Sequence, residues 1–222
     1  MDRSAPLTLT GYHFSVYTRS VAMALYAKGA VFTFDACDPF DPAQSAAMHL
    51  IHPFGRVPVL RHGNFTLYET SAILHYCDEA LPGPSLRPDG VCAMARLRQV
   101  MGVCDAYVYG PLIRGAVSNG LFAPLEGTPP DRPAFNAGLA AAPQVLDALE
   151  VIAAEGLVLV PGQLCLDACL LWPMLDYFRQ LDAGAAMLAE RPALSQWAET
   201  MSIHPAALKT RPDLTRLTGD PK

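Results

Sequence analysis

The sequence predicts an α/β N-terminal domain followed by an all-helical bundle. Over the first 80 residues, short stretches of alternating apolar and polar residues take turns with stretches of helical periodicity. Residues 82–90 then hold three prolines and two glycines, which neither a helix nor a strand accommodates easily. Beyond residue 91 the periodicity is helical. We therefore place a first domain at residues 1–82, a linker at 83–90 and a helical domain at 91–222, with a polar tail from about residue 211.

The N-terminal domain begins with a strand, a helix and a second strand. Residues 7–10 alternate between apolar and polar side chains, as a half-buried strand does. Apolar residues then recur at helical spacing from Val21 up to Gly29, and glycine is a usual helix end. Residues 31–34 alternate again. This stretch therefore predicts the order strand, helix, strand.

The same domain ends with a hairpin and a helix. Residues 57–60 and 65–68 have strand patterns and are joined by a short turn that contains Gly63 and Asn64. From Ser71 onward the apolar residues fall on one helical face. A helix is also expected in the proline-punctuated stretch between the second strand and the hairpin. With that helix, the order of elements is βαβ-α-ββα. This is the topology of the thioredoxin-like fold.

The C-terminal half predicts an all-α bundle. One helical segment runs from about residue 91 to 117 with a break near Gly110 and Pro111, and another runs from about 133 to 154. The second has proline in its first turn, where a missing N–H group costs nothing. Residues 166–181 are apolar on all faces, which predicts the buried central helix of the bundle.

Composition and charge argue against several classes of protein. The net charge is −5 and the basic residues are scattered, so we expect no nucleic-acid partner. No uncharged run reaches about 18 residues, and we expect no membrane span. The N-terminus has no signal-like apolar segment and the six cysteines form no CxxC pair, which favours a reduced, cytoplasmic setting. Histidine and cysteine spacing predicts no metal site.

Three motifs carry the chemistry, and they stand in one order along the chain. They are residues 11–19, residues 52–60 and residues 68–74. Together they resemble the glutathione site of the cytosolic glutathione S-transferase family. Within that family, the chain resembles a serine-type, bacterial-like member. The resemblance spans both domains. It implies a cytoplasmic, homodimeric detoxification enzyme that transfers alkyl or aryl groups and uses glutathione as its co-substrate.

Ser15 is the candidate catalytic residue. A free thiol has a pKa near about 8.5, and the thiolate is the nucleophile. A hydroxyl donor and the positive end of a helix dipole would lower that pKa, and Ser15 stands where a helix is expected to begin. Serine is also a good helix N-cap, a role that does not exclude catalysis. Tyr12 and Tyr17 are alternatives, because some family members use a tyrosine near this position.

The resemblance also implies how glutathione is held. Val57-Pro58 would be a cis-proline turn whose backbone pairs with the cysteinyl part of the ligand, as an added strand. Glu69 would pair with the ammonium group of the ligand. The hydroxyl of Thr70 and the N–H groups of the following helix would receive its γ-glutamyl carboxylate.

Other positions carry less specific expectations. Gln44 and Arg56 are candidates for the glycyl carboxylate. His52 stands where the family usually has asparagine, and we interpret it as structural. In the C-terminal half, Asp167 is expected to cap the central helix, although Leu164 leaves the capping box incomplete and Asp167 would have to receive backbone N–H groups.

The second substrate is expected to be a hydrophobic electrophile, which the glutathione thiolate attacks. The candidate pocket residues are Tyr12, His13, Tyr107, Pro111 and Arg114. The predicted function is therefore a glutathione transferase. A non-catalytic glutathione-binding or ligand-binding protein on the same scaffold, or a glutathione-dependent isomerase, remains an alternative.

Overall fold

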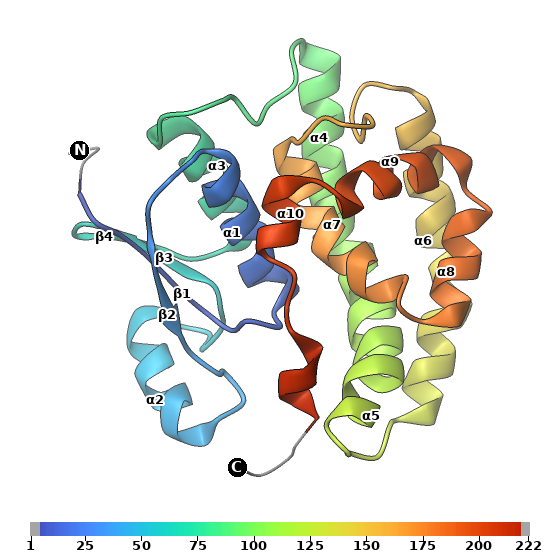
Figure 1. The fold of residues 1–222 in the computed structure, drawn as a ribbon, viewed down its shortest axis with the longest axis horizontal. Coiled ribbons are helices and arrows are strands. Elements are labelled where there is room, and N and C mark those ends of the chain that lie inside the picture. The colour runs from blue at the N-terminus through green and yellow to red at the C-terminus, as the bar shows by residue number, and fades with distance from the viewer. Residues whose placement is uncertain (1–4, 219–222) are drawn as a thin grey trace. The chain divides into compact units, whose positions relative to one another are not determined.

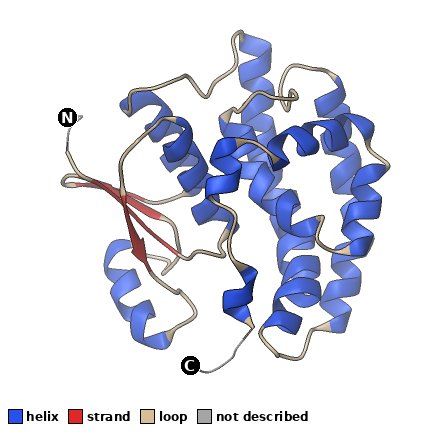
Figure 2. Ribbon diagram, in the orientation of Figure 1, coloured by secondary structure: helices blue, strands red, loops and turns tan. Residues whose placement is uncertain are grey.

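The computed structural model describes residues 5–218. The chain divides into two compact units between Arg87 and Pro88, inside the segment predicted as a linker. Unit 1 holds all the strands of the described residues, and unit 2 is helical (Figures 1 and 2). This arrangement confirms the predicted fold class.

Unit 1 has the thioredoxin-like order of elements. They are β1 (Leu7–Gly11), α1 (Val16–Ala27), β2 (Thr33–Ala36), α2 (Pro42–Ile51), β3 (Val59–His62), β4 (Phe65–Leu67) and α3 (Thr70–Ala80). The strand order in the sheet is β2-β1-β3-β4. β2 runs parallel to β1, whereas β3 is antiparallel to both β1 and β4. Figure 1 shows α1 and α3 on one side of this sheet and α2 on the other.

The core of unit 1 follows from the periodicities in the sequence. The two-residue period of β1 turns Leu7 and Leu9 toward the helices. The apolar faces of α1 and α3 cover them, because residues three and four apart share one face of a helix. The buried cluster consists of Leu7, Leu9, Val21, Ala22, Leu25, Leu60, Ile73, Cys77 and Leu81.

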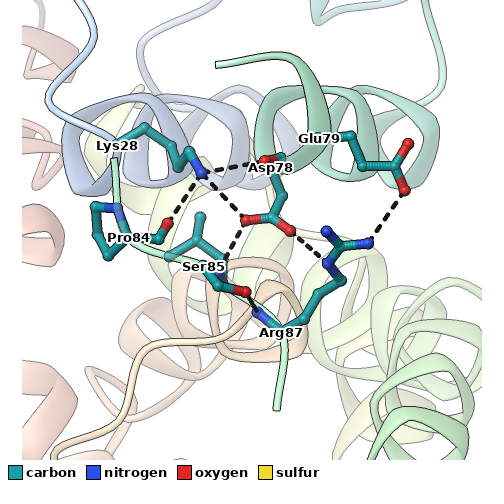
Figure 3. Close-up of polar contacts among 7 residues, drawn as sticks. Lys28, Asp78, Glu79, Pro84, Ser85 and Arg87 are labelled. Atoms are coloured by element: carbon teal, nitrogen blue, oxygen red, sulfur yellow. Dashed lines mark hydrogen bonds and ion pairs between the residues drawn. The ribbon is translucent and has the colours of Figure 1, made fainter. Parts of the chain in front are cut away.

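A buried ion pair holds the segment that follows α3 against unit 1 (Figure 3). Lys28, at the end of α1, donates from Nζ to the carbonyl oxygen and to Oδ1 of Asp78, at 3.1 and 3.3 Å, and to the carbonyl oxygen of Pro84 at 2.9 Å. The backbone of Gly83 passes close by at φ +111°, where a Cβ atom would lie 2.5 Å from the Lys28 carbonyl oxygen. Only glycine fits there.

The carboxylate of Asp78 is almost fully paired. Oδ1 accepts from the Leu86 N–H group at 2.8 Å, and Oδ2 lies 2.6 Å from Nε of Arg87. The side chains of Lys28 and Asp78 are only 3% and 1% exposed. A charge at such a depth is tolerated because several partners surround it. Removing one partner would leave the other charge buried and unpaired.

We predict that Asp78→Asn lowers the free energy of unfolding by about 3–5 kcal/mol, because Lys28 then keeps its charge without a counter-ion. The matched control is Glu79→Gln. Glu79 also pairs with Arg87, at 3.3 Å, but its side chain is 62% exposed, so the control should lose less than about 1 kcal/mol. Denaturant unfolding of both variants checks this, and equal losses would contradict the account.

Unit 2 is a bundle of helices. Its longer elements are α4 (Val91–Val103), η1 (Cys104–Phe122), α6 (Arg132–Ala154), α7 (Leu166–Phe178), α8 (Asp182–Ala189) and α9 (Pro192–Ser202). The shorter ones are α5 (Ala123–Leu125), α10 (Pro205–Lys209) and η2 (Leu214–Leu217). Every residue of α7 is buried, which confirms the predicted central helix. The predicted polar tail from about residue 211 includes the short turn η2, and its last four residues lie outside the described range.

The predicted helix break near Gly110 and Pro111 is wrong. η1 continues through both residues as a π-helix, and at its end the N–H group of Ala123 bonds to the carbonyl of Ser118, five residues back. This wider winding gives the proline ring room that an α-helix lacks. Packing also holds the helix together, because Gly115 of η1 and Gly138 of α6 allow the two backbones to touch: a Cβ atom on Gly115 would lie 2.9 Å from the Cα atom of Gly138.

One helix of the described residues, α6, is long and apolar enough to cross a membrane by length and composition alone. The core helix of a bundle passes the same test. In unit 2, α6 packs against η1, α8 and α9, and these contacts account for its apolar face.

The start of α7 carries the buried carboxylate of Asp167. Its N-cap residue is Cys165, which makes no side-chain capping bond. Asp167 is fully buried, and neither carboxylate oxygen has a hydrogen bond of normal geometry to the described residues. Burial raises the pKa of Asp167 to about 6, although the nearby backbone N–H groups of Ala168, Asp167 and Leu159 favour the charged form. Backbone N–H groups therefore act on the Asp167 carboxylate, and its role as the cap of α7 stays a prediction.

Asp167 predicts an unusual pH dependence of stability. The folded pKa of about 6 lies above the ordinary value of 3.8, so the folded state binds this proton more tightly than the unfolded chain does. The resulting stabilisation is complete below the unfolded pKa and is lost as the pH rises through the folded pKa. Relative to wild type, Asp167→Asn should therefore gain up to about 1.4 kcal/mol of stability per pH unit between about pH 4 and 6.

Denaturant unfolding across this pH range measures the difference between the two proteins. Asp182→Asn is the matched control, because Asp182 also lies in the first turn of a helix but is exposed. If Asp167→Asn and wild type keep a constant difference in unfolding free energy, then Asp167 is not the group that titrates.

Candidate functional site

The pairing of the strands brings three loops to one edge of the sheet. Thr10, near the end of β1, pairs with Val59, the first residue of β3. Leu67, the last residue of β4, pairs with Leu60. The loop after β1, the turn before β3 and the junction after β4 therefore meet at the same edge. These are the three sequence motifs, and all of them belong to unit 1.

Ser15 is the N-cap of α1. Its backbone is extended, with φ −70° and ψ 123°, and its Oγ accepts a hydrogen bond from the N–H group of Thr18 at 3.3 Å. This bond uses a lone pair of the hydroxyl, so the hydroxyl hydrogen remains able to donate. The first turn of α1 contains no acidic residue that would neutralise the positive end of the helix dipole. Ser15 is half-buried, which allows contact with a ligand.

The loop between β1 and α1 is held tightly to the first turn of the helix. The N–H group of Tyr12 donates to Oγ1 of Thr18 at 3.4 Å. A Cβ atom on Gly11 would lie 2.3 Å from Cγ2 of Thr18, so only glycine lets the strand end this close to the helix. This contact fixes where Ser15 lies relative to the sheet.

Aromatic rings surround this loop. The ring of Tyr12 packs edge-on against Phe14 and Phe40, at 5.3 and 6.0 Å between centroids. His13 stacks on Phe34 at 4.4 Å. Tyr12 and His13, both predicted to line the second-substrate pocket, therefore lie on an aromatic surface of unit 1. Tyr17, the other alternative to Ser15, is half-buried in the first turn of α1.

The turn before β3 has the expected geometry at its proline. The Val57–Pro58 peptide bond is cis, as the resemblance implies. Pro58 is buried and Val57 is half-buried. β3 begins at the residue after Pro58, Val59. The backbone of Val57 therefore lies just before the strand, outside its pairing with β1 and β4. An extended peptide can pair with such an edge.

Glu69 has a strained backbone. Its φ is +70° and its ψ is 112°, a region that costs a non-glycine residue about 1–3 kcal/mol and that occurs mostly at functional sites. Glu69 is the N-cap position of α3 but makes no capping bond with its exposed side chain. Thr70, the first residue of α3, is buried. The side chain of Glu69 therefore does not cap α3, and its role in ligand binding stays a prediction.

Gln44 and Arg56 differ in their contacts with the rest of the protein. Oε1 of Gln44 accepts from the Asp38 N–H group at 2.9 Å, and Nε2 donates to Oδ2 of Asp41 at 2.8 Å. Gln44 therefore organises the loop between β2 and α2. Arg56 is exposed in the turn before Val57. The assignment of both residues to the glycyl carboxylate stays a prediction.

A thiol of the protein also lies at this edge. Cys37 directly follows β2, and its N–H group bonds to the carbonyl of Gly11 at 2.9 Å. Burial, followed by the charges of Asp35, Asp38 and Asp41, raises the pKa of the Cys37 thiol. A protonated thiol is a poor nucleophile, so this geometry gives no support to chemistry by Cys37.

The remaining candidates lie in unit 2. Tyr107, Pro111 and Arg114 all belong to η1, where Tyr107 is 64% exposed and Arg114 lies over the ring of Tyr109 at 5.8 Å. Their role as pocket residues stays a prediction. Among the described residues, no group of three or more His, Cys, Asp or Glu side chains is placed to hold a metal ion.

The sequence did not predict how His52 is placed beside the site. His52, which we interpret from the sequence as structural, packs its ring against Tyr68, the residue before Glu69, at 4.6 Å between centroids. The signal in the sequence was a titratable side chain in a position that usually holds an amide. Its contact with Tyr68 joins two of the three loops and could not be read from spacing.

The chain resembles known proteins over most of its length. The model of the glutathione S-transferase N-terminal domain matches residues 9–85. Glutathione S-transferase 3 of Zea mays is 30% identical over 211 residues, which cover 93% of each chain. Glutathione S-transferase F10 of Arabidopsis thaliana is 27% identical over 203 residues, or 90% of this chain and 94% of that one.

Solved structures agree as well. Glutathione S-transferase III in its apo form aligns with a TM-score of 0.80 and 27% identity, over 93% of this chain and 95% of that chain. Glutathione transferase F7 of Populus trichocarpa aligns with a TM-score of 0.76 and 25% identity, over 96% and 99%. Zea mays, Arabidopsis thaliana and Populus trichocarpa are plants, so these similarities give no support to the predicted bacterial-like subtype. The predicted glutathione transferase is confirmed at the level of the family. The chain belongs to the glutathione S-transferase family.

Proposed function

We propose that this protein binds glutathione at the edge of unit 1 where the three loops meet, and that Ser15 activates the glutathione thiol for attack on a hydrophobic electrophile. The observation that carries the proposal is the position of Ser15. Its hydroxyl lies at the positive end of α1 and at the same sheet edge as the cis Val57–Pro58 turn and the Glu69–Thr70 junction.

The chemistry requires a lower thiol pKa. Each unit of depression corresponds to about 1.4 kcal/mol of extra stabilisation of the thiolate. The Ser15 hydroxyl can donate a charge-assisted hydrogen bond to the sulfur, and the end of α1 adds about 0.3–2 kcal/mol. Together these contributions lower the pKa by one or two units, from about 8.5 to near neutrality. This makes the enzyme a serine-type member of its family.

The ligand would be held along its whole length. The Val57 backbone pairs with the cysteinyl residue, which places the thiol toward Ser15. The exposed carboxylate of Glu69 pairs with the ammonium group, and the Thr70 hydroxyl with the N-terminus of α3 receives the γ-glutamyl carboxylate. The strain at Glu69 supports this assignment, because backbone strain of this kind occurs mostly at functional sites.

The setting is a cytoplasmic homodimer in this proposal. None of the six cysteines is in a disulfide bond, which suits a reducing compartment. Unit 1 also exposes large apolar side chains around the end of α2, namely Leu50, Ile51 and Phe54. A second copy of the chain would cover such residues.

Ser15→Ala tests the catalytic role. We predict that the pKa of protein-bound glutathione rises by about one to two units in the variant, because the sulfur loses its hydroxyl donor. The activity toward an electrophile, as kcat/KM at neutral pH, should fall about 10- to 100-fold. The ultraviolet absorbance of the bound thiolate, followed as a function of pH, measures the pKa directly.

The variant also loses a helix cap, which costs about 1 kcal/mol of stability. Asp131→Ala is the matched control for that loss, since Oδ1 of Asp131 caps α6 by accepting from Ala134 at 2.9 Å. It should be destabilised to a similar extent and keep the bound thiol pKa. If Ser15→Ala leaves the pKa unchanged, then Tyr12 or Tyr17 takes the role of Ser15. If wild type does not lower the pKa at all, the catalytic proposal fails.

A further inference from the structure

His52 joins the turn before β3 to the junction after β4, and it does so with a titratable ring. It is the C-cap of α2, where its N–H group donates to the Met48 carbonyl at 2.9 Å. The side chain is buried, with the residue only 3% exposed. A buried histidine that touches two loops of a ligand site is a candidate for positioning those loops.

The turn after α2 depends on two acceptors of His52. The His52 carbonyl accepts from the Gly55 N–H group at 2.8 Å, and Nδ1 of the ring accepts from the Phe54 N–H group at 3.2 Å. Because Nδ1 accepts, the neutral ring carries its proton on Nε2. In the imidazolium form both ring nitrogens are donors, so Nδ1–H would face the Phe54 N–H group and the bond would be lost.

The other side of the ring lies against the Glu69 segment. It packs on Tyr68 at 4.6 Å with an interplanar angle of 35°. The charged and titratable groups that act on it are Glu69 from the α3 N-terminus, Arg56 from the turn and His49 from α2. Burial is the largest cause that lowers the pKa of His52; Arg56 and His49 act in the same direction, while Glu69 opposes them. The neutral ring is therefore the form that fits its surroundings.

We propose that His52 is a positioning residue of the glutathione site, and that only its neutral form holds the turn before Val57 and the Tyr68–Glu69 segment in the geometry that binds glutathione. The proposal rests on the proposed function. Protonation removes the Phe54 bond and loosens the turn that leads to Val57. Glutathione binding consequently weakens on acidification, although no ligand contact of His52 itself is broken.

The affinity for S-methylglutathione as a function of pH tests this, measured by calorimetry between pH 5 and 7. This probe has no titratable thiol, and its carboxylates and amine ionise outside this range. In wild type the affinity should fall by up to about tenfold for each pH unit below the pKa of His52. His52→Asn retains an acceptor for the Phe54 N–H group but cannot be protonated. It should bind within about threefold of wild type at pH 7 and lose its dependence on pH.

Two further variants serve as comparisons. His52→Ala removes the acceptor and the ring. Its affinity for S-methylglutathione should therefore be reduced at pH 5 and at pH 7 alike, without a pH dependence. His49→Gln is the matched control, because it removes a nearby exposed histidine and should keep the acid loss of wild type. Affinity in His52→Ala equal to that of wild type, or an unchanged acid loss in His52→Asn, would overturn the proposal.

Failure of this proposal can be told apart from failure of the proposed function. If wild type does not bind S-methylglutathione at pH 7, or if Glu69→Gln binds it as well as wild type, the proposed glutathione site is wrong. Hydrogen exchange at the Phe54 amide reads the His52 contact without any ligand. Protection there should be lower in His52→Ala and retained in His52→Asn, and protection that is equal in all three proteins contradicts the role of His52 by itself.

Discussion

The register between β1 and β3 is the constraint on which the site depends. Because Thr10 pairs with Val59 and Leu60 pairs with Leu67, three loops from distant parts of the sequence end at one edge of the sheet. A shift of one residue would turn Leu9 and Leu60 out of the core, since side chains alternate between the faces of a strand. The core that fixes this register therefore also fixes where Ser15, Val57 and Glu69 meet.

The residues that stabilise unit 1 and the residues of its candidate site lie in different parts of the unit. The core side of the sheet is apolar and well packed, and the buried ion pair of Lys28 and Asp78 anchors the segment after α3. The loop edge instead holds a strained residue, Glu69, and a buried histidine, His52. Strain of this kind persists only where the surrounding structure determines it. The rigid core is thus what allows the loop edge to keep a strained conformation at Glu69.

Much of the fold could be predicted because its signals are local. The two-residue period of residues 7–10 and the helical period after Ser71 each identify an element by themselves, and the order of elements then gives the topology. The failure at Gly110 and Pro111 has a non-local cause. Backbone packing between Gly115 and Gly138 holds η1 through a sequence that would end an isolated helix. The complete burial of Asp167 likewise depends on tertiary packing around α7.

The candidate site was predictable as three motifs in order, but not as a geometry. Spacing indicated that Ser15 begins a helix and that Glu69 precedes one. It could not show that the side-chain amide of Gln44 bonds to Asp38 and Asp41, or that the ring of His52 packs against Tyr68. The most direct test of the account is a nuclear magnetic resonance titration of the protein with S-methylglutathione, followed at the backbone amides. The account predicts that the largest shifts occur together at Ser15, Val57, Glu69 and Thr70. Shifts confined to residues away from that sheet edge, or no shifts at saturating ligand, would contradict it.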